Sequence, residues 1–351
     1  MTIEHYIGFD VHKKSISFCI KRADGSIFDE GRFRATRHEI KGWVGRQTAS
    51  WHGAMEATLF SGWIYDEMKP YAARLDMGNP SMMKAISAAK KKNDRLDARK
   101  IADLVRCDLL PKCYVGPREM RELRRMLRYR NAMVGHAVQI KCRMSGLLME
   151  SGAEYNRKQL HGKQYFSELM EGLEEVPASV KELLQMSRGM LEMFEKTQRQ
   201  LVERLNEAPL LKKRLALLRT IGGVGEITSL TWALEMMDPR RFSSIGDALS
   251  YCGLTSALNV SADKAQRGPL SKQRNGHLQT VLIEAAKVAP RWNAQLAEVH
   301  EKELSRGHKN QATLEVARKL VAYLLAVDKS GRPFELRKPV QQPAEEVLAV
   351  G

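Results

Sequence analysis

Short apolar segments that end in a carboxylate most constrain how the first hundred residues of this chain can fold. One segment runs from Tyr6 to Val11 and carries Asp10, and another runs from Gly53 to Glu56. Segments of this length, bounded by polar residues, are typical of strands in a sheet. Carboxylates that gather on one sheet repel each other unless a cation lies between them. The pattern therefore favours an α/β fold that brings acidic side chains together around a bound cation.

The order of the segments predicts a mixed α/β domain of the ribonuclease H type. Three strands over residues 4–34, with a hairpin turn at Asp24-Gly25, come first. The segments that follow are a helix over 37–48, a strand ending at Glu56, a helix over 63–71, a strand near 73–75, and helices through Lys84 and over 94–105. In this layout Asp10 on the first strand and Glu56 on the fourth lie side by side. A helix crossing above them adds Asp94 and Asp97 from one face, because positions i and i+3 are neighbours.

Apolar residues at three- and four-residue spacing predict a coiled helical middle of the chain. Two long helices are expected, with breaks at Ser151-Gly152 and Val176-Pro177, and Arg130 interrupts the apolar stripe of the first. An intramolecular antiparallel hairpin and a dimerisation arm fit this spacing equally well. A mainly helical region follows, with a last long helix over 294–325 that is interrupted near Gly307. The predicted parts of the chain are residues 1–115, 116–210, 211–330 and a loose tail, 331–351.

A cluster of glycines begins the third of these parts. Residues 220–226 read Thr-Ile-Gly-Gly-Val-Gly-Glu and lie between two helix-like stretches. Glycines before a helix can expose backbone N–H groups that bind a phosphate, as in helix-hairpin-helix modules. A plain tight turn explains the same residues at least as well.

The charge of the chain indicates a polyanionic partner. Lys and Arg number 57 against 41 Asp and Glu, which gives a formal net charge of +16. The excess is uneven, because residues 81–130 contain 15 Lys or Arg and 6 Asp or Glu. A basic segment of this density is typical of a surface that contacts a nucleic-acid backbone.

Other features of the sequence exclude membrane and disulfide-stabilised classes. No run approaches the roughly eighteen consecutive apolar residues that a membrane span needs. The first residues, MTIEHYIGFDVHKK, lack the layout of a signal peptide. The five cysteines are scattered without metal-ligand spacing, which is typical of reduced, partly buried thiols in a cytoplasmic protein.

The four acidic residues of the first part suggest a magnesium site for phosphodiester chemistry. Asp10, Glu56, Asp94 and Asp97 offer the hard oxygen ligands that Mg²⁺ prefers, and two ions roughly 3.5–4 Å apart would stabilise both the attacking and the leaving oxygen. Singly, each has another explanation: Asp10 in a turn, Asp94 in a helix cap, Asp97 paired with a nearby cation. As a set in this order they favour the catalytic interpretation. The possible substitutes are Glu30, Asp66, Asp76 and Asp103.

A second candidate site is the basic, serine-containing segment over residues 251–278. Ser261 is followed by four cations that would stabilise charge on an attacked phosphate, namely Lys264, Arg267, Lys272 and Arg274. From these residues alone, a solvated loop that contacts phosphates is the better interpretation.

The two sites together resemble one family, the DEDD transposases of the IS110 type, which are related to the Piv DNA invertases and are also called bridge recombinases. The first block reads FDVHKKSISFCI, AMEAT and KKNDRLDARKIADL; the second reads LRTIGGVGEITSLTWALEMMDPRRFSSIGDALSYCGLT and, after the serine segment, NGHLQTVLIEAA. The resemblance spans roughly residues 4–328. It implies a RuvC-like domain whose Mg²⁺ ligands are Asp10, Glu56, Asp94 and Asp97. It also implies a transposase domain whose serine becomes covalently linked to DNA.

The match to the family places that serine at Ser261, with two departures. Ala262 and Asp263 stand where the family has two glycines, and Pro269-Leu270 replaces an Arg-Ile pair, so Ser256 is the alternative nucleophile. The resemblance further implies donor and target DNA, a guide RNA encoded by the element, a homo-oligomer (dimer or tetramer) and action at the bacterial nucleoid. The expected nucleic-acid contacts are Lys91, Lys92, Arg95, Arg99, Lys264, Arg267, Lys272 and Arg274.

Two other functions remain open from the sequence. A metal-dependent, structure-specific nuclease would use the same acids with water as the nucleophile and would leave hydrolysed ends. A non-catalytic nucleic-acid-binding relative would bind without needing Mg²⁺. The complete set of four acids argues against the second of these, because without a metal the clustered charges only repel.

Overall fold

The computed structural model describes residues 2–86, 93–261 and 264–336. The chain forms two compact units, with the boundary between Arg118 and Glu119. In the described part of the chain, none of the helices has both the length and the hydropathy needed to cross a membrane.

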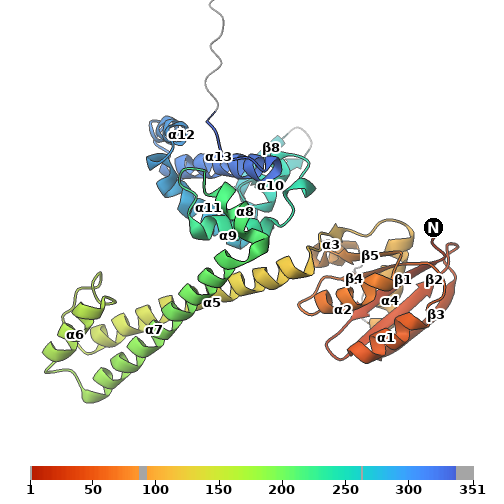
Figure 1. Cartoon of the computed structure of the whole chain (residues 1–351), viewed down its shortest axis with the longest axis horizontal. Helices are drawn as coiled ribbons and strands as arrows, with labels where there is room; N and C mark the ends of the chain where they lie inside the picture. The colour runs from red at the N-terminus through yellow and green to blue at the C-terminus, as the bar shows by residue number, and fades with distance from the viewer. Residues whose placement is uncertain (1, 87–92, 262–263, 337–351) are drawn as a thin grey trace, which may run out of the picture. The chain divides into compact units, whose positions relative to one another are not determined.

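The N-terminal unit is built on a mixed sheet of six strands with helices on both faces (Figure 1). The strands are β1 His5–Val11, β2 Ser15–Lys21, β3 Ile27–Arg34, β4 Trp51–Glu56, β5 Arg74–Gly78 and β6 Lys112–Cys113. Their order across the sheet is β3-β2-β1-β4-β5-β6, with β1, β4 and β5 parallel and the other pairs antiparallel. This topology is compatible with a ribonuclease H-like fold, as the sequence predicted.

One face of this sheet is covered by α1 (Arg37–Gly45) and α2 (Ser61–Met68), which continues into η1 (Lys69–Tyr71). Alternate residues of the strands point toward these helices and form an aromatic-rich core. Phe9 of β1 packs edge-on against Trp43 of α1, with ring centroids 5.3 Å apart. Thr36 caps α1 by accepting a hydrogen bond from the backbone of Glu39. The core between these helices and the sheet is mainly apolar.

The other face carries α4 (Asp94–Arg106) and α3 (Pro80–Ile86). Helix α4 packs directly on the backbone of β1 at Gly8, where a Cβ atom would lie only 2.1 Å from the carbonyl oxygen of Ala98 and 2.4 Å from the backbone nitrogen of Ala102. Ala98 and Ala102 are themselves fully buried. Small residues on both sides therefore let the helix backbone approach the strand more closely than any larger residue would allow.

The register of the sheet places two of the predicted acids in neighbouring strands. Phe9 pairs with Met55 in the parallel β1–β4 ladder, so Asp10 and Glu56 are the next residues of the two strands. Because side chains alternate, and Phe9 and Met55 both belong to the core under α1 and α2, Asp10 and Glu56 project from the α4 face. The expectation that these two residues lie side by side is confirmed.

The C-terminal unit begins with a long helical hairpin. It consists of α5 (Arg118–Glu150), α6 (Lys163–Gly172) and α7 (Ala178–Glu207). Ala137, Met144 and Leu148 of α5 share one buried cluster with Leu184 and Leu191 of α7 (Figure 1). Helices α5 and α7 thus pack against each other within one chain, as an intramolecular hairpin. A role of this hairpin in dimerisation stays a prediction.

The rest of this unit is a mostly helical bundle with one small hairpin of strands. Its elements are α8 Pro209–Leu218, α9 Glu226–Met236, η2 Pro239–Arg241, α10 Ile245–Tyr251, β7 Ser256–Ser261, β8 Lys264–Leu270, α11 Gly276–Val288, η3 Ala289–Arg291, α12 Ala294–Leu304 and α13 Lys309–Ser330. Helix α9 is buried on all sides, and its Trp232 donates a hydrogen bond of 2.9 Å to Asp328 of α13. The predicted interruption near Gly307 is confirmed, because Gly307 has a φ of +84° between α12 and α13.

The structure differs from expectation in the serine segment. Strands β7 and β8 pair antiparallel where a basic loop was predicted. The sequence pattern that indicates strands is short there. Leu258 and Val260 alternate with polar residues over only a few positions, and Gly268 and Pro269, which are unfavourable in strands, fall within the second strand. The predicted loose tail falls mainly on residues 337–351, which lie outside the described residues.

The contact at Gly8 gives a first prediction. In Gly8→Ala the new methyl group meets backbone atoms of α4, which cannot rotate away, so α4 must move off the sheet. We expect the free energy of unfolding of the N-terminal unit to fall by about 1–3 kcal/mol, measured by denaturant titration. Gly45→Ala is the matched control, because a Cβ there meets no atom within 4 Å, and its stability should be unchanged or slightly raised. Equal stability of the two variants would contradict this account of the packing.

Candidate active site: an acidic cluster and a serine hairpin

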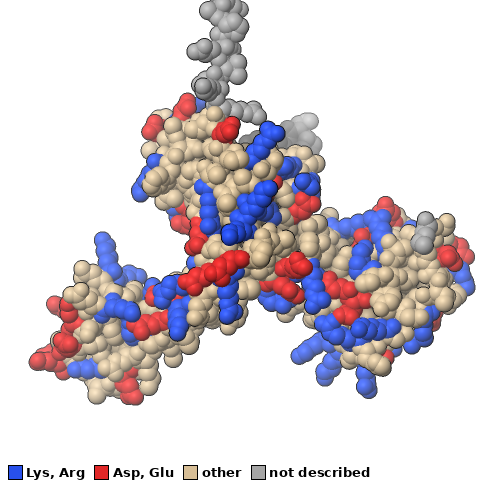
Figure 2. All heavy atoms as spheres, viewed as in Figure 1, with Lys and Arg blue, Asp and Glu red and all other residues tan. Residues whose placement is uncertain are grey.

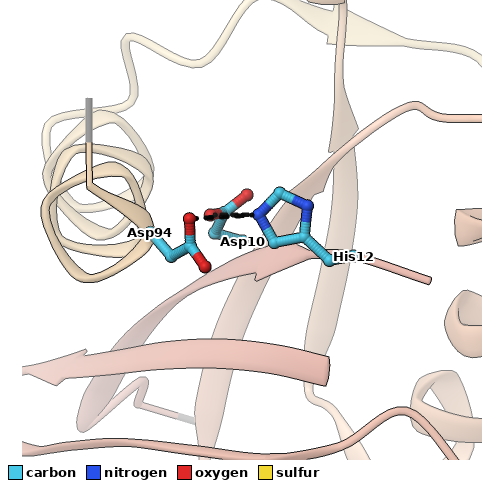
Figure 3. Close-up of side chains that lie close together, drawn as sticks. All are labelled: Asp10, His12 and Asp94. Carbon is cyan, nitrogen blue, oxygen red and sulfur yellow. Dashed lines mark hydrogen bonds and ion pairs between the residues drawn. The ribbon is translucent and has the colours of Figure 1, made fainter. Parts of the chain in front are cut away.

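Asp10, His12 and Asp94 come together at the end of β1 (Figure 3). The Nε2 atom of His12 lies 3.1 Å from Asp10 Oδ2 and 3.3 Å from Asp94 Oδ1. One potential ligand atom from each residue lies within 4.8 Å of the other two. The cluster thus offers two carboxylates and an imidazole at metal-binding spacing.

The backbone explains why these residues meet. Asp10 is the penultimate residue of β1, and Asp94 is the first residue of α4. Asn93 caps α4 by accepting a hydrogen bond of 3.0 Å from the backbone N–H of Arg95, which sets where the helix begins. The contact at Gly8 then brings this first turn over the end of β1. The positions of Asp10 and Asp94 relative to each other therefore follow from the helix cap at Asn93 and the packing contact at Gly8.

The electrostatics of Asp10 indicate a site suited to a cation. Burial raises the pKa of the Asp10 carboxyl, His12 lowers it, and the charges of Asp94 and Asp97 raise it further. The Asp10 side chain is only 14% exposed, so water screens this repulsion poorly. A divalent cation would remove the repulsion, and the mainly oxygen donor set fits one of the hard ions, Mg²⁺ or Mn²⁺.

The other two predicted ligands lie near the cluster without joining it. Glu56 is half-buried at the end of β4, the strand next to Asp10. Asp97 lies one turn after Asp94, and its Oδ1 accepts a hydrogen bond of 3.2 Å from Lys100 Nζ. Among the described residues, neither belongs to the group with mutual distances below 4.8 Å. The structure thus gathers Asp10 and Asp94 closely, with Glu56 and Asp97 at the margin.

His12 is the member of the cluster that sequence reasoning missed. It follows β1 directly and lies two residues after Asp10, a spacing that puts two side chains on the same face of an extended chain. Its imidazole is 43% exposed and bridges the two carboxylates. The signal was present as Asp-x-His at a strand end, but a lone histidine there has no specific meaning.

The substitutes for the acidic ligands have other partners or positions. Glu30 accepts hydrogen bonds of 2.7 Å from both Arg99 Nε and Arg99 Nη2, and it also pairs with Arg95. Asp76 lies 3.0 Å from His52, and Asp103 accepts a bond of 2.6 Å from Lys21. Asp66 is on α2, which covers the opposite face of the sheet. The structure thus gives no reason to exchange any of them for a predicted ligand.

The predicted nucleic-acid contacts fall into three groups. Arg95 and Arg99 are engaged by Glu30, although Arg95 stays 63% exposed. Lys272 and Arg274 are exposed in the segment after β8, and Lys264 and Arg267 lie on β8 itself. Lys91 and Lys92 lie outside the described residues.

The two candidate nucleophiles lie at opposite ends of the β7–β8 hairpin. Ser261 is the last residue of β7 and pairs with Lys264 of β8, next to the turn. Ser256 is the first residue of β7 and pairs with Leu270 at the base of the hairpin. Ala262 and Asp263, the residues that depart from the family pattern, lie outside the described residues.

A buried carboxylate anchors the base of this hairpin. The side chain of Glu235 on α9 is fully buried and accepts two hydrogen bonds of 2.8 Å from Arg128 of α5. Asn275, which caps α11 directly after the hairpin segment, donates a further bond of 2.8 Å to Glu235. The backbone N–H of Asn275 also bonds the carbonyl of Tyr251 at 2.9 Å, which closes the loop that carries the hairpin.

The charge of Glu235 is maintained by these partners. Burial by itself raises the pKa of Glu235, but the hydrogen bonds from Arg128 and Asn275 and the nearby arginine charges outweigh burial and lower it. Sequence reasoning missed this residue, although an acid inside the apolar stretch ITSLTWALEMM was a usable signal.

Removal of an acid from the first cluster tests its cation-binding capacity. We expect millimolar Mg²⁺ or Mn²⁺ to raise the unfolding temperature of the wild-type protein, because binding to the folded state alone stabilises it. Asp10→Asn and Asp94→Asn should lose most of this increase. Asp29→Asn, an exposed position on β3, is the control and should keep it. An equal increase in all four proteins, measured by differential scanning fluorimetry, would place the ion elsewhere.

Removal of the buried charge tests the anchor of the hairpin. Glu235→Gln leaves the half-exposed Arg128 without its counter-charge and weakens its hydrogen bonds, and we expect a loss of about 1–3 kcal/mol in unfolding free energy. Glu284→Gln, which breaks an exposed pair with Lys287, should cost at most about 1 kcal/mol. Because the folded pKa of Glu235 lies below its ordinary value of 4.5, its contribution is present above pH 4.5 and is lost as the pH falls through the folded pKa. The stability difference between wild type and Glu235→Gln should therefore shrink on acidification; a constant difference would contradict this assignment.

Two family models and one curated relative match this chain. A family model described as "Transposase", of the DEDD type named for IS110, matches residues 7–152. A second, described as "Transposase IS116/IS110/IS902 family", matches residues 215–301, and the two together match about two thirds of the chain. A protein of Sinorhizobium fredii (strain NBRC 101917 / NGR234), named "Putative transposase y4qE", is 22% identical over 288 residues, which are 81% of this chain and 71% of that protein. The first match contains the acidic cluster and the second contains the serine hairpin; the chain belongs to the IS110 family of transposases.

Proposed function

We propose that this protein cuts and rejoins DNA as the transposase of an insertion sequence, and that a guide RNA encoded by the element selects donor and target DNA. Its N-terminal unit is a RuvC-like catalytic domain and its C-terminal unit carries a serine nucleophile. The observation that supports the proposal most is the cluster of Asp10 and Asp94 at the end of β1, where α4 packs closely on the strand at Gly8. Such a cluster of partly buried carboxylates costs folding free energy unless it serves to bind a cation.

In this proposal Asp10, Glu56, Asp94 and Asp97 hold Mg²⁺, and His12 orients Asp10 and Asp94 toward it. Bound Mg²⁺ would neutralise charge on the phosphate under attack and on the leaving oxygen. The side chains themselves fix where the ion binds, because Asp10 is held by β1 and Asp94 by the capped start of α4. Glu30 keeps Arg95 and Arg99 beside this face, where they can contact the phosphates of a bound strand.

The serine step conserves the energy of the broken bond. The Oγ atom of Ser261 forms a bond to the phosphorus of a DNA phosphodiester, the bond from phosphorus to one deoxyribose oxygen breaks, and the serine proton leaves as that oxygen becomes a hydroxyl. Lys264, the ladder partner of Ser261 on β8, is a cation suited to stabilise the charge on the phosphate. Attack by another DNA hydroxyl on the phosphoserine reverses these changes and rejoins the strands without a nucleotide cofactor.

The surface charge supports nucleic-acid partners. The chain has a net charge of +16, and Figure 2 shows Lys and Arg side chains gathered on the C-terminal bundle where Figure 1 labels α8 and α10. Such surfaces attract the phosphate backbone of DNA and RNA without reading sequence. We propose that a homo-oligomer, a dimer or a tetramer, holds donor DNA, target DNA and the guide RNA together.

A covalent-adduct assay tests the proposal. Purified protein, Mg²⁺, junction DNA and the RNA flanking the gene are combined and resolved on a denaturing gel. We expect a protein–DNA band with the wild-type protein and none with Ser261→Ala or Asp10→Asn. Ser256→Ala is the matched control on the same hairpin and should keep the band. Hydrolysed ends without any adduct would favour the nuclease, and a normal adduct from Ser261→Ala would exclude Ser261 as the nucleophile.

A further inference from the structure

A cavity of about 980 Å³ lies within the C-terminal unit, and neither Glu235 nor a residue of the serine hairpin lines it. Its walls come from α5, from the glycine turn and first residues of α9, from α11 and from Trp292. We propose that this cavity binds one unpaired nucleotide of a single-stranded nucleic acid. The proposal rests on the proposed function only in taking nucleic acid as the partner, and it assigns that partner a specific site.

Arg130 brings a positive charge to this cavity, which the carboxylate of Glu226 also lines. Arg130 is the residue that interrupts the apolar stripe of α5, and here it lines the cavity. Its Nη1 atom donates to Asn131 Oδ1 at 3.1 Å, but its Nε atom is buried and has no hydrogen-bond partner among the described residues. The nearby carboxylate of Glu226 already accepts a bond of 2.6 Å from Asn206. The Arg130 guanidinium lines the cavity, and a phosphate oxygen of a ligand could accept charge-assisted hydrogen bonds from it.

The start of α9 adds backbone donors to the same cavity. Gly225 precedes the helix and provides no side-chain cap, so the first backbone N–H groups of α9 have no side-chain acceptor. Gly222 and Gly223 pack tightly on η3: a Cβ on Gly222 would lie 2.6 Å from the carbonyl oxygen of Trp292, and one on Gly223 would lie 2.5 Å from Ala289 Cα. These glycines hold the turn against Trp292. The N-terminus of α9 and Arg130 therefore border one cavity beside the Glu226 carboxylate, and both can contact a ligand phosphate.

Trp292 makes the cavity suitable for a base as well as a phosphate. Its side chain lines the cavity and is 73% exposed, whereas Trp43, Trp51 and Trp232 are buried. Exposed aromatic rings beside a basic groove are the platforms on which proteins stack unpaired bases. The apolar side chains of Val281 and Val288 extend this wall.

The combination selects against other ligands. A purely hydrocarbon ligand would offer Arg130 no acceptor, and a free inorganic anion would leave the apolar wall and the indole without a partner. A nucleotide supplies an apolar base face and a phosphate in one molecule, and Asn131 and His277, whose side chains lie 3.5 Å apart, can meet the polar edge of the base. A base within a duplex is already stacked on both faces and has no face free for Trp292. The cavity therefore fits an unpaired nucleotide.

Tryptophan fluorescence of the full chain, without Mg²⁺, tests the proposal independently of catalysis. The probes are a twelve-nucleotide RNA, a DNA of the same sequence, and the DNA duplex. We expect saturable quenching by at least one single strand, much less by the duplex, and loss of this quenching in Trp292→Phe. Quenching by RNA alone would assign the guide as the source, quenching by DNA alone a melted DNA strand, and quenching by both the shared nucleotide chemistry.

Affinity is measured with the same strands by fluorescence anisotropy. Arg130→Gln and Trp292→Ala should each weaken single-strand binding about tenfold, from lost phosphate and stacking contacts. Arg125→Gln is the matched control, because Arg125 is exposed on α5 and does not line the cavity, and it should change Kd less than about twofold, as expected for one non-specific phosphate contact. Thermal unfolding at the wild-type temperature shows that each variant is folded.

Three results would overturn the inference: no quenching of Trp292 by any single strand, equal quenching by the duplex, or an equal effect of Arg125→Gln and Arg130→Gln. None of these outcomes depends on Asp10 or Ser261. A wild-type protein that forms the covalent adduct but shows no quenching would refute the cavity assignment and leave the proposed function intact.

Discussion

The close contact between α4 and β1 is the interaction on which the acidic site depends. At Gly8 the helix backbone touches the strand backbone, and buried Ala98 and Ala102 provide the other side of the contact. Hydrophobic burial alone would tolerate a helix that is shifted by an ångström or two. Backbone contact does not, because no flexible side chain lies between the two elements to absorb the shift. The same contact that holds the helix therefore also fixes the distance from Asp94 to Asp10.

The serine hairpin depends on a different kind of constraint. Two short strands with little apolar surface cannot hold their own orientation. Glu235 compensates, because its buried charge binds Arg128 from α5 and Asn275 from the end of the hairpin segment. Both oxygens of the buried Glu235 carboxylate accept hydrogen bonds, and these are directional, whereas an apolar contact is not. Each of the two candidate sites thus has its own anchor within its own unit.

Polar residues that break an apolar pattern mark the functional features of this chain. Asp10 interrupts a buried strand, Glu235 interrupts a buried helix, and Arg130 interrupts the stripe of α5. Each lies where a hydrophobic residue would stabilise the fold more simply. Glu235 is satisfied by protein partners, whereas Asp10 faces other carboxylates and Arg130 retains an unsatisfied donor. Asp10 and Arg130 are the positions at which we infer ligands.

The sequence by itself determined the order of strands and helices in the N-terminal unit, the pairing of Asp10 with Glu56 and the two long helices of the middle. The elements follow from period-two and helical spacing and from turn residues, which are local properties, and the pairing follows from the ribonuclease H-type layout that their order predicts. Membership in a transposase family was also readable from the motifs. The roles of Ser261 and of the four acids remain predictions of that resemblance.

Only the tertiary structure decided which polar groups meet. His12 joins the acids because α4 approaches β1 at a glycine, and Glu235 meets Arg128 across more than a hundred residues of sequence. The cavity beside Arg130 exists because the glycine turn packs on η3. Such contacts depend on how far apart two backbones lie, which the spacing of residues along one chain does not specify. Sequence pattern thus determined the elements and their faces, and close packing between the elements decided the chemistry that those faces present.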